Sequence, residues 1–266
     1  MHDLIKLEKH GAVAVITMNR PDQLNPLGKA GDGQAFVDAT NEIVADPEIR
    51  CAVLTGAGRA FSAGGDLKAM KERTGAFGGN PAQVREGYTK NIHMIVNSLW
   101  KFEIPLIAAV NGPAVGLGCD VACMADMRIA SASARFGMPF LRLGIIPGDG
   151  GAWLLPRIVG LSRAAEMIFT GDLYDADTAV EWGLASKKVD DNKLMDEAME
   201  LAGKVAKQPP RSLKFAKSLL RQGQSATYEQ IMELSAAMQA LLHTTDDHME
   251  GVTALLEKRT PTFTGN

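Results

Sequence analysis

The stretch that sets the fold is Leu106-Ile107-Ala108-Ala109-Val110 followed by Asn111-Gly112-Pro113-Ala114-Val115-Gly116-Leu117-Gly118-Cys119-Asp120. An apolar, strand-like run leads here through a loop of small residues into a predicted helix. The same order of features occurs earlier in the chain, where Ala52-Val53-Leu54 precedes Phe61-Ser62-Ala63-Gly64-Gly65. Helix N-termini carry free N–H groups, and the helix dipole favours negative charge there. The two loops therefore predict two backbone amides aimed at one oxygen, an oxyanion hole built from the main chain.

Strands and helices alternate over the first two thirds of the chain. Two strand-like segments, Leu4 to Glu8 and Val13 to Met18, flank a His10-Gly11 turn and predict a hairpin. Apolar residues at helical spacing then run from Gly28 to Ala45, before the strand Cys51 to Leu54. The pattern continues with a helix at 91–100, a helix at 116–125 and strands at 106–110, 128–130 and 134–136. It predicts an α/β fold with a parallel sheet and right-handed crossovers.

The composition of the chain changes after Lys187-Lys188-Val189. Four helical patterns follow without strands between them, at 194–206, 210–220, 229–242 and 246–258. We therefore predict a core over residues 1–190 and a helical region over 191–266. The third of these helices has more apolar residues than one helix layer needs, which predicts contact with another subunit (Ile231, Met232, Leu234, Met238, Leu241 and Leu242).

Bulk properties limit the classes of function. The chain has 266 residues, of which 46% are hydrophobic, and a formal net charge of -3 with acids and bases interspersed. No basic stripe is present, so a nucleic acid is not the expected ligand. Three cysteines without paired spacing favour a reducing, cytoplasmic location. The charged N-terminus and the absence of a long apolar run predict neither a signal peptide nor a membrane span.

Two aspartates are candidates for acid–base chemistry. Asp120 lies three residues after Leu117, so that one helix turn supplies both an oxyanion donor and a base; alternatively, Asp120 only interacts with its own helix N-terminus or an adjacent polar group. Asp149 lies in Pro147-Gly148-Asp149-Gly150-Gly151, where the glycines allow close approach of a substrate, although an Asp there is also a natural N-cap. Asp66 is predicted to cap the helix that starts at Leu67.

Familiar alternatives fail on spacing. Val121 stands where a dinucleotide-binding fingerprint needs its third glycine, and the chain has no Gly-Lys-Ser/Thr P-loop. Ser62 lacks the Gly-x-Ser-x-Gly pattern of a hydrolase nucleophile elbow. The histidines form no set with a third ligand, so we predict no metal and expect them on the surface or in packing (His2, His10, His93, His243 and His248).

At this point the sequence resembles the crotonase superfamily, the enoyl-CoA hydratase/isomerase family, from about Leu4 to Phe263. The motifs that carry the resemblance occur in family order: Asn19-Arg20-Pro21 with Leu24-Asn25, Ala60 to Leu67, Val110 to Asp120, Leu143 to Gly151 and Glu257-Lys258-Arg259. The resemblance implies a crotonase-type ββα spiral core with a C-terminal helical trimerisation region, assembled as a homotrimer or homohexamer. It also implies an acyl-CoA thioester substrate, with coenzyme A present only as part of that substrate and no separate cofactor.

Carried over residue by residue, the resemblance gives roles to several positions. The amides of Gly65 and Leu117 would form the oxyanion hole, and Leu24 and Ala63 would line the CoA channel. Lys258 matches a position that meets the CoA phosphates from a neighbouring subunit.

The acid–base positions depart from the family pattern. Family hydratases use two glutamates, whereas this chain has Asp120 at the first position and Phe140 at the second. A phenylalanine cannot transfer a proton. Asp149 lies where dienoyl-CoA isomerases of the family place a proton-shuttling aspartate, and an apolar neighbour such as Phe140 would raise its pKa.

The sequence thus predicts an enzyme that hydrates or shifts a C=C double bond through a thioester enolate. Family frequency favours hydration, while Asp149 together with Phe140 favours isomerisation. A non-catalytic acyl-CoA-binding or RNA-binding protein of the same fold stays open, as do decarboxylation and C–C hydrolysis.

Overall fold

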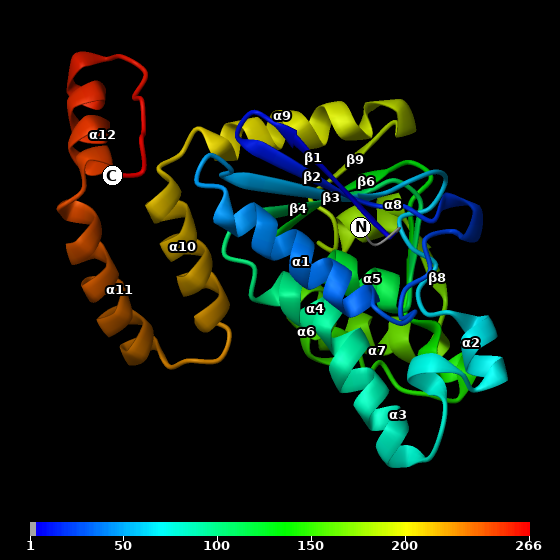
Figure 1. Cartoon of the computed structure of the whole chain (residues 1–266). Helices are drawn as coiled ribbons and strands as arrows, with labels where there is room; N and C mark the ends of the chain where they lie inside the picture. Colours follow the sequence, from blue (N-terminus) through cyan, green and yellow to red (C-terminus); the bar gives the residue numbers. More distant parts are fainter. Residues whose placement is uncertain (1–3) are drawn as a thin grey trace.

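A computed structural model describes residues 4–266 and shows a six-stranded sheet at the centre of the molecule (Figure 1). The strand order is β1-β2-β3-β4-β6-β9, in which β1 pairs antiparallel with β2 and all other neighbours are parallel. The strands are β1 (Ile5–His10), β2 (Val13–Met18), β3 (Cys51–Gly56), β4 (Leu106–Val110), β6 (Met127–Ser131) and β9 (Lys187–Val189). The predicted hairpin and parallel α/β arrangement are confirmed.

A second sheet of three short strands stands beside the first. It comprises β5 (Pro113–Val115), β7 (Arg135–Gly137) and β8 (Leu173–Asp175), with β5 parallel to β7 and β7 antiparallel to β8. Because β5 directly follows β4 in the chain, the loop predicted to carry one amide of the oxyanion hole runs from one sheet into the other.

Both faces of the central sheet are buried, as the alternation of side chains along β3 shows. Ala52 and Leu54 belong to the larger apolar core, while Cys51 and Val53 face a second, smaller core. The helices that contribute to the larger core are α1 (Asp32–Ala45), α4 (His93–Trp100), α5 (Leu117–Met124), α6 (Gly151–Val159), α7 (Leu161–Thr170) and α8 (Ala176–Glu181). The smaller core is covered by α9 (Leu194–Ala206), which runs along the sheet in Figure 1.

The helical region after residue 190 has two parts. Its first helix, α9, packs on the sheet through Leu194, Ala198 and Ala202 and so completes the core. The other three helices, α10 (Pro210–Gln222), α11 (Tyr228–His243) and α12 (Asp246–Glu257), extend to one side (Figure 1). Helix α11 buries none of its residues, and Leu255 on α12 is 80% exposed. Helix α10 is linked to the core through Lys217, which donates to the Ile104 carbonyl, and the predicted division at 190/191 stays a prediction.

The segment between β3 and α4 covers one edge of the site. It holds α2 (Leu67–Glu72), a 3-10 turn over Gly75–Phe77 and α3 (Pro81–Gly87), followed by a π-helical turn, Tyr88–Ile92, that runs into α4. Asp66 caps α2 as predicted, because its carboxylate accepts hydrogen bonds from the N–H groups of Lys68 and Ala69. Within residues 4–266, no helix has the length and apolar character needed to cross a membrane.

Candidate active site

The two small-residue loops lie side by side, joined by a backbone bridge between Ser62 and Ala114. The N–H of Ser62 donates to the Pro113 carbonyl at 3.0 Å, and the N–H of Val115 donates to the Ser62 carbonyl at 3.0 Å. Gly118 permits this approach, since a Cβ there would stand 2.3 Å from the Ser62 carbonyl oxygen. The loops predicted to converge are therefore in direct contact.

The N–H groups of Gly65 and Leu117 donate no hydrogen bond to any acceptor within residues 4–266. Both residues line one cavity of about 260 Å³, whose walls are mostly apolar. Gly64 keeps the loops close here, because a Cβ on it would lie 2.4 Å from the Val115 carbonyl oxygen and 3.4 Å from the Leu117 nitrogen. Two backbone donors are thus left free at the wall of one cavity, where a substrate oxygen can use them.

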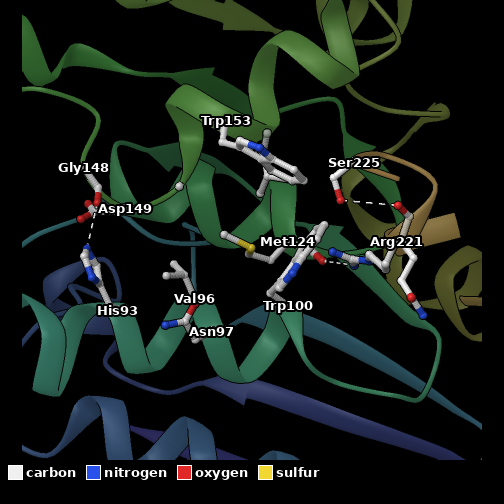
Figure 2. Close-up of a pocket in the computed structure, with 13 residues that line it drawn as sticks. His93, Val96, Asn97, Trp100, Met124, Gly148, Asp149, Trp153, Arg221 and Ser225 are labelled. Carbon is white, nitrogen blue, oxygen red and sulfur yellow. Dashed lines mark hydrogen bonds between the residues drawn. The ribbon is translucent and has the colours of Figure 1, made fainter. Parts of the chain in front are cut away.

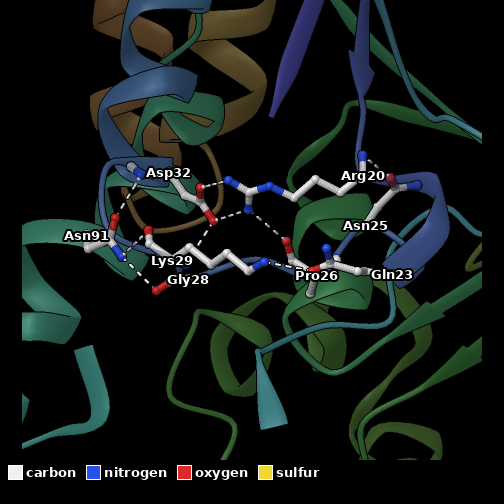
Figure 3. Close-up of polar contacts among 9 residues, drawn as sticks. Arg20, Gln23, Asn25, Pro26, Gly28, Lys29, Asp32 and Asn91 are labelled. Atoms are coloured by element: carbon white, nitrogen blue, oxygen red, sulfur yellow. Dashed lines mark hydrogen bonds and ion pairs between the residues drawn. The ribbon is translucent and has the colours of Figure 1, made fainter. Parts of the chain in front are cut away.

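A buried ion pair supports the loop that carries Gly65 (Figure 3). Arg20 donates to both carboxylate oxygens of Asp32, at 2.7 and 2.9 Å, and Asp32 also accepts from the Lys29 N–H at 2.9 Å. Asn91 ties this segment to the π-helical turn before α4, since its side-chain amide donates to the carbonyls of Gly28 and Lys29. Every oxygen of Asp32 is therefore paired.

Asn25 holds the loop itself. It is fully buried, and its side-chain nitrogen donates to the carbonyls of Ala57 and Ala60 at 2.9 and 2.8 Å. Next to it, the Leu24 carbonyl accepts from the Ala63 N–H at 2.9 Å. Ala63 lines the cavity, whereas Leu24 is not among its lining residues. Leu24 thus positions the loop through its backbone, and its predicted contact with the CoA moiety stays a prediction.

Asp149 lines the same cavity as Gly65 and Leu117 and is 5% exposed. Its Oδ1 has no hydrogen-bond partner within the described residues. Burial raises the pKa of Asp149 to about 6, and the nearby His93 partly opposes this rise. The alternative that Asp149 is an N-cap is wrong, because Gly150 is the N-cap of α6 and no side chain caps that helix.

His93 is a residue of the site that the sequence did not single out. Its Nε2 lies 2.9 Å from the Gly148 carbonyl oxygen, and because a carbonyl only accepts, Nε2 must donate (Figure 2). This bond ties the loop before α6 to the start of α4. His93 was expected on the surface or in packing, and no spacing signal links it to a partner so distant in the chain. The predicted surface or packing position of His2 lies outside the described residues.

Asp120 is fully buried in the first turn of α5 and does not line the cavity. Neither carboxylate oxygen has a hydrogen-bond partner within residues 4–266. Burial is the largest cause that raises the pKa of Asp120 well above its usual value, and the charges of Asp149 and Cys123 add to it. The Gly151 backbone acts against this rise, although it does not form a hydrogen bond with the carboxylate. The carboxylate thus makes no hydrogen bond to its own helix N-terminus within the described residues, while an electrostatic interaction with that terminus or with the adjacent Gly151 backbone stays open.

The remaining predicted positions lie at opposite ends of the molecule. Phe140 is 7% exposed and lines the cavity, close to Gly116. Lys258 follows α12 and is exposed, far from this cavity within the same chain. Its predicted contact with CoA from a neighbouring subunit stays a prediction. Within residues 4–266 no cluster of three or more His, Cys, Asp or Glu side chains could hold a metal ion.

Comparison with known proteins gives a consistent result. A profile described as "Enoyl-CoA hydratase/isomerase" matches residues 8–266. The chain is 37% identical to a 1,2-epoxyphenylacetyl-CoA isomerase of Escherichia coli, over all of both chains. It is 39% identical to a short-chain-enoyl-CoA hydratase of Clostridium acetobutylicum, over 95% of this chain and 94% of that one. The solved structure of an enoyl-CoA hydratase from Bacillus anthracis superposes with a TM-score of 0.92 at 33% identity, covering 99% of this chain and 100% of the other.

Proposed function

Because the chain belongs to the enoyl-CoA hydratase/isomerase family and has the crotonase fold, we propose that it shifts the double bond of an enoyl-CoA thioester. The observation that carries this proposal is the number of carboxyl groups at the cavity. Asp149 is the only acidic side chain that lines it within residues 4–266, and Phe140, which the sequence resemblance matches to the second family glutamate, lines it as well. One carboxyl group can move one proton between two carbons, which is the requirement of isomerisation.

The proposed reaction begins with a 3-enoyl thioester whose carbonyl oxygen accepts hydrogen bonds from the Gly65 and Leu117 amides. The Asp149 carboxylate removes a proton from C2, and the electron pair moves so that negative charge develops on the thioester oxygen. Protonated Asp149 then returns the proton to C4, and the double bond moves from C3–C4 to C2–C3. No separate cofactor takes part in these steps.

The electrostatics of the pocket suit this cycle. A pKa of about 6 for Asp149 lies close to neutral pH, so the group can both accept and return a proton. The free amides would stabilise the enolate, and losing one donor from such a site typically costs about 100 to 1,000-fold in rate. Burial and the neighbouring charge of Asp149 raise the pKa of Asp120, which disfavours a second negative charge beside Asp149.

The proposal is tested by following the absorbance of the conjugated thioester. Incubation with a 3-enoyl-CoA should give an increase in absorbance as the 2-enoyl product forms, and Asp149→Asn should abolish it. Loss of absorbance when the protein is incubated with a 2-enoyl-CoA would identify hydration instead. Binding of both thioesters with no spectral change would support the non-catalytic alternative.

Hydration is the second candidate, favoured by the relatives that are named hydratases. It requires a second group to position the water or to supply a proton, and Asp120 is the candidate, since the charge of Asp149 acts on its pKa. Asp120→Asn separates the two reactions. Isomerisation should survive within about tenfold, because the amide replaces a neutral acid, whereas hydration that depends on Asp120 should be lost.

We further propose that the projecting helices α10 to α12 mediate assembly into a trimer or hexamer and bring Lys258 to a neighbour's CoA phosphates. The exposed apolar side chains on α11 and α12 support an interface there, among them Met232, Leu241, Met249, Leu255 and Leu256. Light scattering coupled to size exclusion measures the assembly. A monomer at micromolar concentration would contradict this part of the proposal.

A further inference from the structure

A second cavity, of about 510 Å³, lies beyond Asp149 and has no role in the steps above. Asp149 lines both cavities, so they meet at this residue. Figure 2 shows Asp149 and His93 at one end, Arg221 and Ser225 at the other, and two indole rings between them. Because Asp149 lines both cavities, an acyl chain that places C2 to C4 at its carboxylate can extend into the second one.

The middle of this cavity is aromatic. Trp100, the last residue of α4, and Trp153, in the first turn of α6, stand edge to face with ring centroids 5.1 Å apart. Met124 adds a thioether beside them, and Val96 and Leu154 complete the apolar lining. Aromatic pairs and sulfur–aromatic contacts favour a further ring over a flexible alkyl chain, because a ring makes these contacts with less loss of conformational freedom.

Each indole is in contact with an arginine. The Arg221 guanidinium lies 4.0 Å from the centroid of the Trp100 ring, and the Arg157 guanidinium lies 4.0 Å from that of Trp153. Rings fixed by such contacts lose little freedom when a ligand arrives, and a preorganised wall binds more tightly for that reason.

The charges of the cavity disfavour an acidic ligand. Arg221 is the only basic residue with a permanent charge in the lining within residues 4–266, and it donates to the Asp126 carboxylate and the Met124 carbonyl, each at 2.7 Å. Asp149 at the entrance would repel a carboxylate. A distal acid group would therefore find no free cation here, whereas a neutral ring would meet apolar surface.

We propose that this cavity binds the distal part of the acyl group and that Trp100 and Trp153 select substrates whose acyl chain ends in an aromatic ring. This inference rests on the proposed function, since it takes the position of the acyl chain from the reaction at Asp149. The volume is sufficient, because a protein cavity of ~150 Å³ already accepts benzene.

The test uses saturated thioesters, which bind without reacting, in isothermal titration calorimetry on the full-length protein. 4-Phenylbutanoyl-CoA and decanoyl-CoA have the same number of acyl carbons, and butanoyl-CoA ends near Asp149. We expect the phenyl compound to bind at least about tenfold more tightly than butanoyl-CoA and more tightly than decanoyl-CoA. Tighter binding of decanoyl-CoA than of the phenyl compound would overturn the aromatic preference.

Substitution of the two tryptophans tests whether they cause the preference for the phenyl compound. Trp153→Ala should weaken binding of 4-phenylbutanoyl-CoA about tenfold relative to butanoyl-CoA, and Trp100→Leu should act in the same direction. Trp182→Ala is the control, because Trp182 is half-buried, as Trp100 is, and lies near an arginine, Arg163, but lines neither cavity. A phenyl-to-butanoyl affinity ratio that is unchanged in both Trp153→Ala and Trp100→Leu would overturn the inference.

Turnover assays on the same protein separate this inference from the proposed function. A phenyl preference in binding without any double-bond chemistry would contradict the function and leave the cavity assignment intact. Isomerisation of enoyl-CoA substrates without the binding preference would do the reverse.

Discussion

Asp32 and Asp120 are both buried aspartates near the start of a helix, but their carboxylate oxygens differ in hydrogen bonding. Each lies in the first turn of a helix, α1 or α5, and each is fully buried. Asp32 accepts two hydrogen bonds from Arg20 and one from the Lys29 N–H. Asp120 accepts none within residues 4–266, and its neighbour Asp149 leaves one oxygen unpaired as well.

The difference separates a structural acid from a functional one. A buried carboxylate without partners destabilises a fold, whereas a paired one at least recovers part of its desolvation cost. Asp32 therefore belongs to the support of the loop before Gly65. Asp120 and Asp149 have no such pairing, and a buried acid with a raised pKa is a candidate for a functional group, the role proposed here for Asp149.

The largest effect is expected from Asp149→Asn. The amide is nearly the same size but cannot accept a proton, so isomerisation should fall about a thousandfold, within the usual range for removal of a general acid–base group. The measurement is kcat/KM from the conjugated-thioester absorbance. Asp190→Asn, at an exposed acid, is the control and should change the rate less than twofold. Activity within tenfold of the unaltered protein would show that Asp149 does not carry the proton.

On the structural side, Asp32→Ala should destabilise the fold by about 3 to 5 kcal/mol, because it leaves the Arg20 guanidinium, itself largely buried, without its carboxylate. Chemical denaturation followed by circular dichroism gives the free energy of unfolding. Asp38→Ala on the same helix, where the side chain is exposed, should cost less than about 0.5 kcal/mol. Equal costs for the two variants would remove the distinction drawn here.

Asp149→Asn should also stabilise the protein while it inactivates it. The folded-state pKa of Asp149 is raised from 3.8 to about 6, so ionisation is disfavoured in the folded state, and stability is lost as the pH rises through this range. Each pH unit is worth about 1.4 kcal/mol, and the variant should therefore gain about 3 kcal/mol at pH 8. Below pH 3.8 the gain should disappear. A variant less stable than the parent at pH 8 would contradict the assigned burial cost.

The smallest effect is the pH profile of the unaltered enzyme. Asp149 must be ionised to accept a proton, so kcat/KM should be half-maximal near pH 6 and fall about tenfold for each pH unit below it. Rates of a 3-enoyl-CoA between pH 4.5 and 8 test this, with circular dichroism to exclude acid unfolding. A flat profile across pH 6 would assign the proton transfer to another group.

Strong local signals made much of the fold predictable. The strand Leu106–Val110 and the helix Leu194–Ala206 have the predicted bounds, because uninterrupted apolar runs and helical spacing are bordered by turn residues. The face that each helix covers was not predictable. The amphipathic pattern of α9 shows that one side is buried, but it does not show that the partner is the sheet rather than another subunit.

In the candidate site, the loops that carry backbone amides could be predicted from the sequence, whereas the surroundings of the side chains could not. The two loops and the amide of Leu117 were predicted from small residues and a helix start, which are local signals, whereas Gly65 was predicted from the family resemblance. The surroundings of the Asp120 carboxylate come from a loop distant in sequence. Gly151 in particular lies so close that a Cβ on it would stand 2.1 Å from Asp120 Oδ1. His93 escaped notice for the same reason, since its partner, the Gly148 carbonyl, comes from another element.

The bridge between Ser62 and Ala114 determines when catalytic activity can appear during folding. Residues 63–113 must be ordered or looped out before Ser62 and Ala114 can pair, so the proposed oxyanion hole forms only once the two loops have met. After dilution from denaturant, recovery of turnover should follow recovery of helical circular dichroism rather than accompany it. Proteolytic cleavage of the chain between residues 63 and 113 should likewise abolish turnover while most of the secondary structure is kept.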